Sequence, residues 1–170
     1  FLAAYPDGRI AGIPYKVAVE PEARGTAGAI RFAALEMELN EPFLVLNGDV
    51  LTDLDIGALL SFHQEREAEA TIALQAVADP SRFGVVTTSD DGRVREFIEK
   101  PPANSSPSNT INAGTYVLNP SVIARIPDTR PVSIERETFP KMALAETLFA
   151  LESDTYWLDT GTPKQFLEAN

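Results

Sequence analysis

Two aspartates, each at the end of an apolar stretch, are the first residues whose type and position indicate chemistry. Asp49 closes Asn47-Gly48-Asp49, and Asp159 precedes the Gly-Thr pair at 161–162. In open α/β sheets, ligands bind outside the carboxyl ends of the strands. A carboxylate there, beside a glycine that lets backbone approach a ligand, suits a hard cation such as Mg²⁺. Either aspartate alone is more typical of a turn or a helix cap, so it is the pair that favours a metal site.

Small residues at the start of a predicted helix form a second candidate. Gly25, Thr26 and Gly28 follow an apolar stretch of strand length. Free N–H groups at a helix N-terminus suit an anion, or a flat base that lies against the backbone. The segment matches neither the glycine pattern of dinucleotide-binding proteins nor the P-loop. Small residues also allow a helix to pack tightly on a sheet, and the pattern leaves both interpretations open.

Glu99 and Lys100 end a predicted strand directly before a loop. Lys100 is one of four lysines in the chain. A lysine at a strand end can bind phosphate as a point charge, and the adjacent glutamate can accept hydrogen bonds from sugar hydroxyls. A solvated Glu-Lys pair at the end of a hairpin is the more common outcome, so this signal is weak by itself.

Two further sets of titratable residues are interpreted as structural. His63 lies on the apolar stripe of a helix predicted over 55–67, and no G-x-S-x-G motif of the serine hydrolases accompanies it. Glu135 and Glu137 are expected in the first turn of a helix, where acidic side chains complement the helix dipole.

Apolar runs of strand length alternate with segments of helical period. The predicted strands are Tyr15–Glu20, Phe43–Asp49, Ala70–Val77, Gly84–Ser89, Arg93–Lys100, Asn112–Asn119 and Leu148–Glu152. The predicted helices are Thr26–Leu39, 55–67, a short one after Pro120, Glu135–Glu146 and Pro163–Ala169. The alternation indicates a single α/β domain with a mostly parallel sheet. The first strand, helix and second strand are expected to form a right-handed βαβ unit, and Phe43–Asp49 to be buried on both faces. A turn at Asp90-Asp91-Gly92 predicts one β-hairpin insertion, and Pro101–Thr110 is a predicted loop.

The composition excludes several classes of protein. The chain of 170 residues has no cysteine and one histidine, which excludes disulfide scaffolds, thiolate zinc sites and His-rich metal sites. A net charge of −11 argues against a nucleic-acid binder and against binding to anionic membranes. No apolar run approaches the ~20 residues of a membrane-spanning helix, and no signal peptide is evident, so we expect a cytoplasmic protein.

A set of segments, in this order, resembles the sugar-1-phosphate nucleotidyltransferase family. The segments are EPEARGTAGAI (20–30), FLVLNGDVLTDLD (43–55), RFGVV (82–86), DGRVREFIEKP (91–101), INAGTYVL (111–118), SIERETFPKMA (133–143) and YWLDTGTPKQFLEAN (156–170). NAGTYVL and SIERETFP are most similar to the mannose-1-phosphate guanylyltransferases. Thymidylyl- and uridylyl-transferring relatives share much of the same frame.

The resemblance implies a Rossmann-like mixed sheet flanked by helices. It also implies transfer of a nucleotidyl group from an NTP, with GTP expected first, to a sugar 1-phosphate, with mannose 1-phosphate expected first. By the resemblance, Asp49 and Asp159 bind Mg²⁺; Gly25, Thr26 and Gly48 contact the nucleotide; Gly84, Glu99, Lys100 and Asn112 line the sugar-phosphate pocket, where Lys100 meets the phosphate. Asp49, Lys100 and Asp159 are thus the expected catalytic residues.

One departure from the family concerns the N-terminal side. The family begins with a strand and a basic, glycine-rich loop that grips the triphosphate, and no such loop precedes Glu20. The chain also begins at Phe1 rather than Met. We therefore expect residues 1–170 to form a single catalytic domain truncated at its N-terminus and inactive alone. A non-catalytic module that senses nucleotide sugars is the alternative, and a homo-oligomer stays possible.

Overall fold

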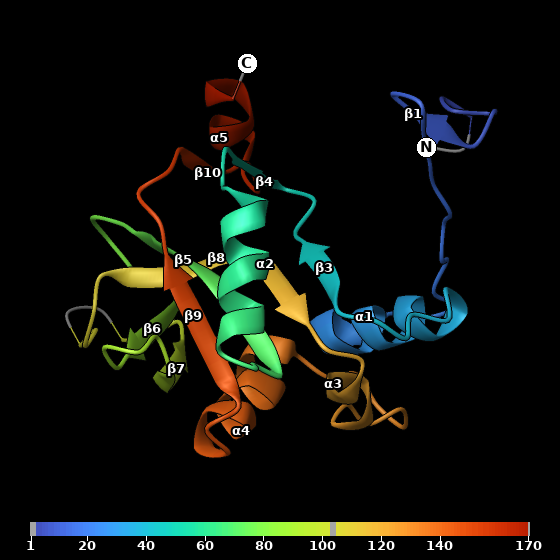
Figure 1. Cartoon of the computed structure of the whole chain (residues 1–170). Helices are drawn as coiled ribbons and strands as arrows, with labels where there is room; N and C mark the ends of the chain where they lie inside the picture. Colours follow the sequence, from blue (N-terminus) through green and yellow to red (C-terminus); the bar gives the residue numbers. More distant parts are fainter. Residues whose placement is uncertain (1–2, 103–104, 170) are drawn as a thin grey trace.

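A mixed β-sheet forms the centre of the computed structural model, which describes residues 3–102 and 105–169 (Figure 1). Its strands are β3 (Phe43–Leu46), β5 (Ala70–Ala76), β6 (Gly84–Thr88), β7 (Val94–Glu99), β8 (Thr110–Leu118) and β9 (Leu148–Glu152). Two-stranded pairs are formed by β1 (Arg9–Ile10) with β2 (Ile13–Pro14), and by β4 (Val50–Thr52) with β10 (Trp157–Asp159). The helices are α1 (Gly25–Glu36), α2 (Ile56–Glu65), α3 (Ser121–Ala124), the π-helix η1 (Ile134–Thr138), α4 (Phe139–Leu144) and α5 (Pro163–Glu168).

The central strand β8 has different neighbours along its two edges. One edge pairs with β5 from Thr110 to Leu118. The other edge pairs with β6 at Ile111 and with β3 from Thr115 onward, so β3 and β6 diverge around Asn112–Gly114. Such a divergence between neighbouring strands is where α/β proteins place ligands.

The α/β class with a mixed, helix-flanked sheet is confirmed, whereas the expectation of mostly parallel strands is wrong for the described residues. Only β5 and β9 run parallel among the pairs of this sheet. The predicted strand Tyr15–Glu20 is absent, and the backbone there has no regular structure, so the expected βαβ unit does not form with it. In Figure 1 this segment instead joins the small β1–β2 hairpin to α1 at a distance from the sheet.

Each face of the sheet carries a hydrophobic cluster, because side chains alternate along a strand. Ile72 and Leu74 of β5 contribute to the larger cluster, which includes Phe139 and Met142 of α4. Ala73, between them in sequence, belongs to the smaller cluster with Leu59 of α2. Strand β3 is only partly buried, contrary to the expectation of burial on both faces, because β8 is its only partner among the described strands.

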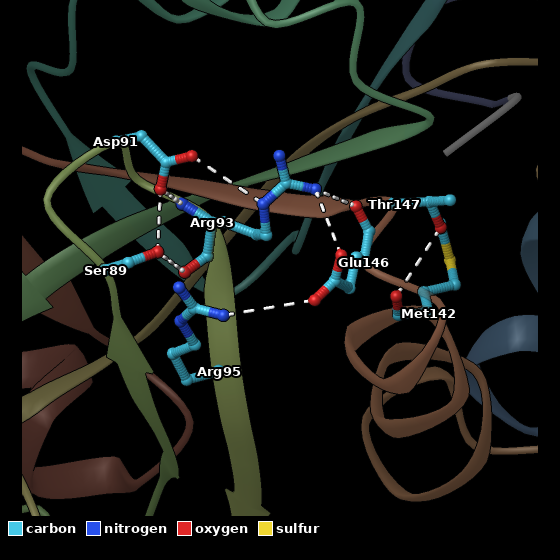
Figure 2. Close-up of polar contacts among 7 residues, drawn as sticks. All are labelled: Ser89, Asp91, Arg93, Arg95, Met142, Glu146 and Thr147. Carbon is cyan, nitrogen blue, oxygen red and sulfur yellow. Dashed lines mark hydrogen bonds and ion pairs between the residues drawn. The ribbon is translucent and has the colours of Figure 1, made fainter.

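The predicted hairpin β6–β7 is confirmed and is tied to the turn after α4, as Figure 2 shows. Ser89 Oγ donates a hydrogen bond of 2.7 Å to Asp91 within the hairpin turn. Arg93 donates one of 2.7 Å to the backbone carbonyl of Glu146, whose carboxylate also lies 4.0 Å from Arg93 and from Arg95. These contacts fix the hairpin that carries Glu99 at its far end.

The ends of several elements follow their sequence signals. Asp55 caps α2 by accepting a hydrogen bond from Ala58, and Thr162 caps α5 by accepting one from Gln165. Pro163 follows directly at the first helical position, where its missing N–H costs nothing. The predicted loop 101–110 has no regular structure over 101–102 and 105–109, and 103–104 lie outside the described residues.

Candidate functional site

The two predicted metal-binding aspartates are brought together by the β4–β10 pair. Asp159 ends β10 opposite Val50, which directly follows Asp49. Thr160 reinforces this junction, because its N–H and its hydroxyl both donate to the backbone carbonyl of Asp49, at 2.7 and 2.9 Å. The two carboxylates thus come from the turn before β4 and from the end of β10, which the pairing of these two strands brings together.

Gly161 shows how closely the two carboxylates converge. A β-carbon at Gly161 would lie 2.9 Å from Oδ1 of Asp159 and 3.4 Å from Oδ2 of Asp49. The Gly161 N–H donates a hydrogen bond of 2.7 Å to the same Asp159 oxygen. Asp49 is exposed and Asp159 is partly exposed, so a ligand can reach both carboxylates. Two hard oxygen donors in this arrangement fit Mg²⁺.

The protein supplies only part of a cation's coordination shell at this point. In the described part of the chain, no group of three or more His, Cys, Asp or Glu side chains is placed to hold a metal ion. A cation between Asp49 and Asp159 would therefore take its remaining ligands from water or from a substrate. Mg²⁺ sites that bind phosphates through one or two carboxylates have this composition.

A small cavity of about 110 Å³ adjoins the aspartates at the divergence of β3 and β6. Asn47, Asn112 and Trp157 contribute to its lining. Trp157 Nε1 donates 2.9 Å to the carbonyl of Ala113, which orients the indole. Asn47 and Trp157 belong to the quoted segments but had no predicted role. Their signal was their position beside Asp49 and Asp159 in those segments.

Asn112 is held by hydrogen bonds within β8. Its Nδ2 donates 2.9 Å to the hydroxyl of Tyr116, and its Oδ1 accepts 3.0 Å from the N–H of Gly114. Tyr116 is buried, and burial raises the pKa of its hydroxyl, with Glu135 and Glu99 acting in the same direction. Tyr116 therefore stays protonated, and its hydroxyl accepts the hydrogen bond from Asn112.

A second cavity, of about 480 Å³, lies where β7 meets η1. Glu99, Lys100, Glu135 and Arg136 contribute to its lining. Lys100 Nζ lies 3.7 Å from Glu99 Oε1, and the lysine side chain is 58% exposed whereas that of Glu99 is 17% exposed. The two side chains thus differ from the fully solvated pair that is common at hairpin ends, because Glu99 is largely buried.

The electrostatic environment of Glu99 differs from that of a surface glutamate. Burial raises the pKa of Glu99, and the nearby charge of Glu135 raises it further, while Lys100 and Arg136 lower it. Gly84 is the partner of Glu99 in the β6–β7 register, and a β-carbon at Gly84 would lie 3.0 Å from Glu99 Oε2. The glycine therefore leaves the space that the Glu99 carboxylate occupies.

Gly25 and Thr26 begin α1, but the expectation of free N–H groups in this turn is wrong for the next two residues. The amides of Ala27 and Gly28 donate to the carbonyl of Val132, at 3.0 and 3.5 Å. Gly25 has φ +73°, and a β-carbon there would lie 2.5 Å from the same carbonyl oxygen. Small residues at this position thus serve close packing.

The three residues predicted to contact a nucleotide, Gly25, Thr26 and Gly48, are all exposed. Thr26 is exposed, and its hydroxyl donates 2.7 Å to Glu135 Oε2. Gly48 is exposed too, and no atom lies within 4 Å of a β-carbon built there. Glu135 was expected only in a helix turn. No sequence signal indicated its contact with Thr26, because 109 positions separate the two residues.

A family model described as nucleotidyl transferase matches residues 3–170 of the chain. A mannose-1-phosphate guanylyltransferase catalytic subunit beta from Danio rerio is 44% identical over 158 residues, covering 92% of this chain and 43% of the relative. The same subunit from Drosophila pseudoobscura pseudoobscura is 44% identical over 149 residues, covering 87% of this chain and 39% of that protein. The chain thus spans about two fifths of the length of the curated relatives that it matches.

Solved structures share the fold. HddC from Yersinia pseudotuberculosis superposes with a TM-score of 0.80 at 26% identity, over 99% of this chain and 71% of HddC, and it has also been solved in complex with GMP-PN. A Bacillus anthracis structure described as a glucose-1-phosphate thymidylyltransferase gives a TM-score of 0.85 at 24% identity, over 99% of this chain and 69% of the other. No helix in the described part of the chain is long and apolar enough to cross a membrane.

Proposed function

The chain belongs to the nucleotidyl transferase family, and from this premise we propose that the protein transfers a nucleotidyl group from an NTP to a sugar 1-phosphate. The curated relatives favour GTP and mannose 1-phosphate as substrates. In this reaction a phosphate oxygen of the sugar 1-phosphate attacks the α-phosphorus of the NTP. The bond between the α-phosphorus and the bridging oxygen breaks, and pyrophosphate leaves with that oxygen. A nucleotide sugar is the other product.

The convergence of Asp49 and Asp159 beside Gly161 is the observation that carries this proposal. Phosphoryl-group chemistry depends on positioning and on neutralising charge, with little need for a covalent intermediate. Asp49 and Asp159 would hold Mg²⁺, which supplies positive charge for the phosphate oxygens when it is bound. This local positive charge would allow a chain with a net charge of −11 to bind anionic substrates.

Residues of the second cavity are assigned to the sugar 1-phosphate. Lys100, exposed at the end of β7, offers its ammonium group to the phosphate. Glu99 accepts hydrogen bonds from sugar hydroxyls, and Gly84 leaves the space for its carboxylate. Asn112, held through Tyr116 and Gly114, lines the smaller cavity beside the two aspartates with a fixed amide.

The nucleotide is assigned to Gly25, Thr26 and Gly48. Gly48 has open space around its α-carbon next to Asp49, which allows ribose or phosphate to approach the backbone. Backbone contacts of this kind distinguish poorly between bases. Thymidylyl or uridylyl transfer is therefore the second candidate, supported by structural neighbours described as a glucose-1-phosphate thymidylyltransferase and a UDP-glucose pyrophosphorylase.

We further propose that these residues do not suffice for catalysis. The residues assigned above bind a metal, a sugar phosphate and one side of a nucleotide, and none supplies a basic grip for a triphosphate. The curated relatives are more than twice as long as the matched region. We expect the 170-residue chain alone to release pyrophosphate at less than about 1% of the rate of the full-length protein under identical conditions. Equal rates in a pyrophosphate assay would contradict this.

We place the proposed activity in the cytoplasm, and it requires neither nucleic acid nor a membrane. A substrate screen of the full-length protein tests this activity. Each NTP is combined with mannose, glucose and galactose 1-phosphate in the presence of Mg²⁺, and pyrophosphate release is followed. We expect the fastest release with GTP and mannose 1-phosphate. Release with dTTP or UTP and glucose 1-phosphate would favour the second candidate. Binding of nucleotide sugars without any release would instead favour a non-catalytic sensing module.

A further inference from the structure

Several hydrogen bonds join the start of α1 to the residues around the first turn of η1. The hydroxyl of Thr26 accepts 2.9 Å from the N–H of Ile134 and donates 2.7 Å to Glu135 Oε2. In the backbone, Val132 donates 2.8 Å to the carbonyl of Arg24 and accepts from the N–H of Ala27. The position of Glu135 is therefore set by the same segment that begins α1.

Glu135 also lines the second cavity, where β7 meets η1, whose residues are assigned to the sugar 1-phosphate. Glu99, Lys100 and Arg136 line the same cavity. The charge of Glu135 also reaches Glu99, since it contributes after burial to raising the pKa of Glu99. Glu135 thus contacts the residue assigned to the nucleotide and faces the residues assigned to the sugar 1-phosphate.

Glu135 is carried by a π-helix rather than by the helix turn that its sequence indicates. The five-residue η1 begins after Ser133, whose hydroxyl donates 2.6 Å to Glu135 Oε2. Short π-helical segments are rare and occur frequently at functional sites. Two hydroxyl donors, from Ser133 and Thr26, converge on one oxygen of a carboxylate in this unusual turn.

From these contacts we propose that Glu135 is a positioning residue that makes nucleotide binding at Gly25–Thr26 and sugar 1-phosphate binding at Glu99 and Lys100 depend on each other. This inference rests on the proposed function. While Thr26 holds Glu135, Oε2 of the glutamate accepts hydrogen bonds from the hydroxyls of both Thr26 and Ser133. Without the Thr26 hydrogen bond, Ser133 is the one hydroxyl of this pair that still donates to Glu135. Glu135 then pairs more readily with Lys100 or Arg136, which line the same cavity, and competes with the sugar phosphate for the ammonium group. A bound nucleotide that orders Thr26 therefore strengthens sugar 1-phosphate binding.

The test measures the affinity of the full-length protein for mannose 1-phosphate by isothermal titration calorimetry, with and without a saturating non-hydrolysable GTP analogue. We expect the analogue to strengthen binding about five- to tenfold in the unmodified protein. Thr26→Val removes the hydroxyl at nearly constant shape, and Glu135→Gln removes the charge. Each is expected to reduce the strengthening to less than about twofold. Thr26→Ser, which keeps the hydroxyl, is expected to retain it.

Glu137→Gln is the matched control, because it removes the same charge from the same π-helix. Glu137 is bonded to Arg130 and has no contact with Thr26. We expect this variant to keep the full strengthening. The double variant Thr26→Val, Glu135→Gln is expected to lose no more than either single variant, as coupled residues do.

Several results would overturn the proposal. One is a Glu135→Gln protein in which the analogue strengthens binding as much as in the unmodified protein. Another is an equal weakening of mannose 1-phosphate binding with and without the analogue, together with a lower melting temperature, which is the signature of a purely structural role. Normal binding of both ligands without mutual influence in the unmodified protein defeats the coupling alone. Failure to bind either ligand defeats the proposed function as well.

Discussion

His63, the single histidine of the chain, is held between two polar partners in the interior. Its Nδ1 lies 2.9 Å from Thr71 Oγ1 and its Nε2 lies 3.2 Å from Asn119 Oδ1. Asn119 is itself oriented by donating 2.8 Å to the carbonyl of Ala68. With this orientation of the Asn119 amide, a neutral ring protonated on Nε2 satisfies both contacts. The predicted structural role of His63 is confirmed.

The stability of the protein is expected to fall in mild acid because of His63. Burial lowers the pKa of His63 in the folded state, and the hydrogen bond that His63 donates to Asn119 only partly opposes this. The unfolded chain therefore binds a proton first as the pH falls below 6.5. The stabilisation is complete above that pH and is lost as the pH falls toward the folded pKa. For one proton the slope cannot exceed about 1.4 kcal/mol per pH unit.

Urea unfolding at pH 7.5, 6.5 and 5.5 measures this dependence. The free energy of unfolding of the unmodified protein should decrease across the series, and His63→Gln should give a flatter profile whatever its absolute stability. If the two proteins lose stability in parallel between pH 7.5 and 5.5, His63 is not the group responsible.

At the scale of elements, local signals in the sequence predicted the hairpin and most of the helices and strands. The Asp-Gly turn fixed β6–β7, and the Thr-Pro pair at 162–163 marked the start of α5. Tyr15–Glu20 has the apolar pattern of a strand but forms none. A strand needs a hydrogen-bonded neighbour, and none of the described strands pairs with this segment. Pairing direction was not readable either, since it depends on contacts between distant strands.

Gly114 in β8 lines the small cavity and lies close to Asn47, another residue of its lining. It has φ +76°, which glycine adopts without strain, and a β-carbon there would lie 2.8 Å from Nδ2 of Asn47. Asn47 also donates its N–H to the carbonyl of Gly114 at 2.9 Å. This close approach holds the Asn47–Asp49 turn against β8.

Gly114→Ala should therefore destabilise the protein and displace the Asn47–Asp49 turn. We expect a loss of about 1–3 kcal/mol in the free energy of unfolding, from backbone strain and from the clash with Asn47. Gly48→Ala is the comparison for stability, because its β-carbon meets nothing within 4 Å and should change stability by no more than about 0.5 kcal/mol. Thermal or urea unfolding of both variants provides the check, and equal stabilities would show that Gly114 is not strained by a side chain.

At the scale of the whole molecule, the candidate site combines residues that were predictable with others that were not. Asp49 and Asp159 could be predicted because each ends an apolar stretch, and ligands of α/β proteins gather at such ends. Tyr116 and Glu135 could not, since an apolar strand and an acidic helix start give no sign of a buried hydroxyl or of a contact between α1 and η1. Their roles follow only from the folded arrangement.

The charge of the molecule makes the pair of aspartates the decisive part of this site. With 25 acidic and 14 basic residues, the protein repels phosphates at long range. Lys100 and Arg136 supply positive charge at one cavity, but the turn with Asp49 and Asp159 adds only negative charge. The proposed binding of a triphosphate beside these carboxylates would therefore need a cation between them to offset the repulsion.

The most direct test is the dependence of pyrophosphate release on Mg²⁺ concentration in the full-length protein. Asp49→Asn and Asp159→Asn are each expected to lower kcat/KM at least about 100-fold, and the double variant little further, because the two carboxylates act as a unit. Asp90→Asn, which removes an exposed aspartate from the β6–β7 turn, should leave the rate and its Mg²⁺ dependence unchanged. The two-aspartate metal site is wrong if either single variant, at Asp49 or at Asp159, has a rate and a Mg²⁺ dependence within twofold of those of the Asp90→Asn protein.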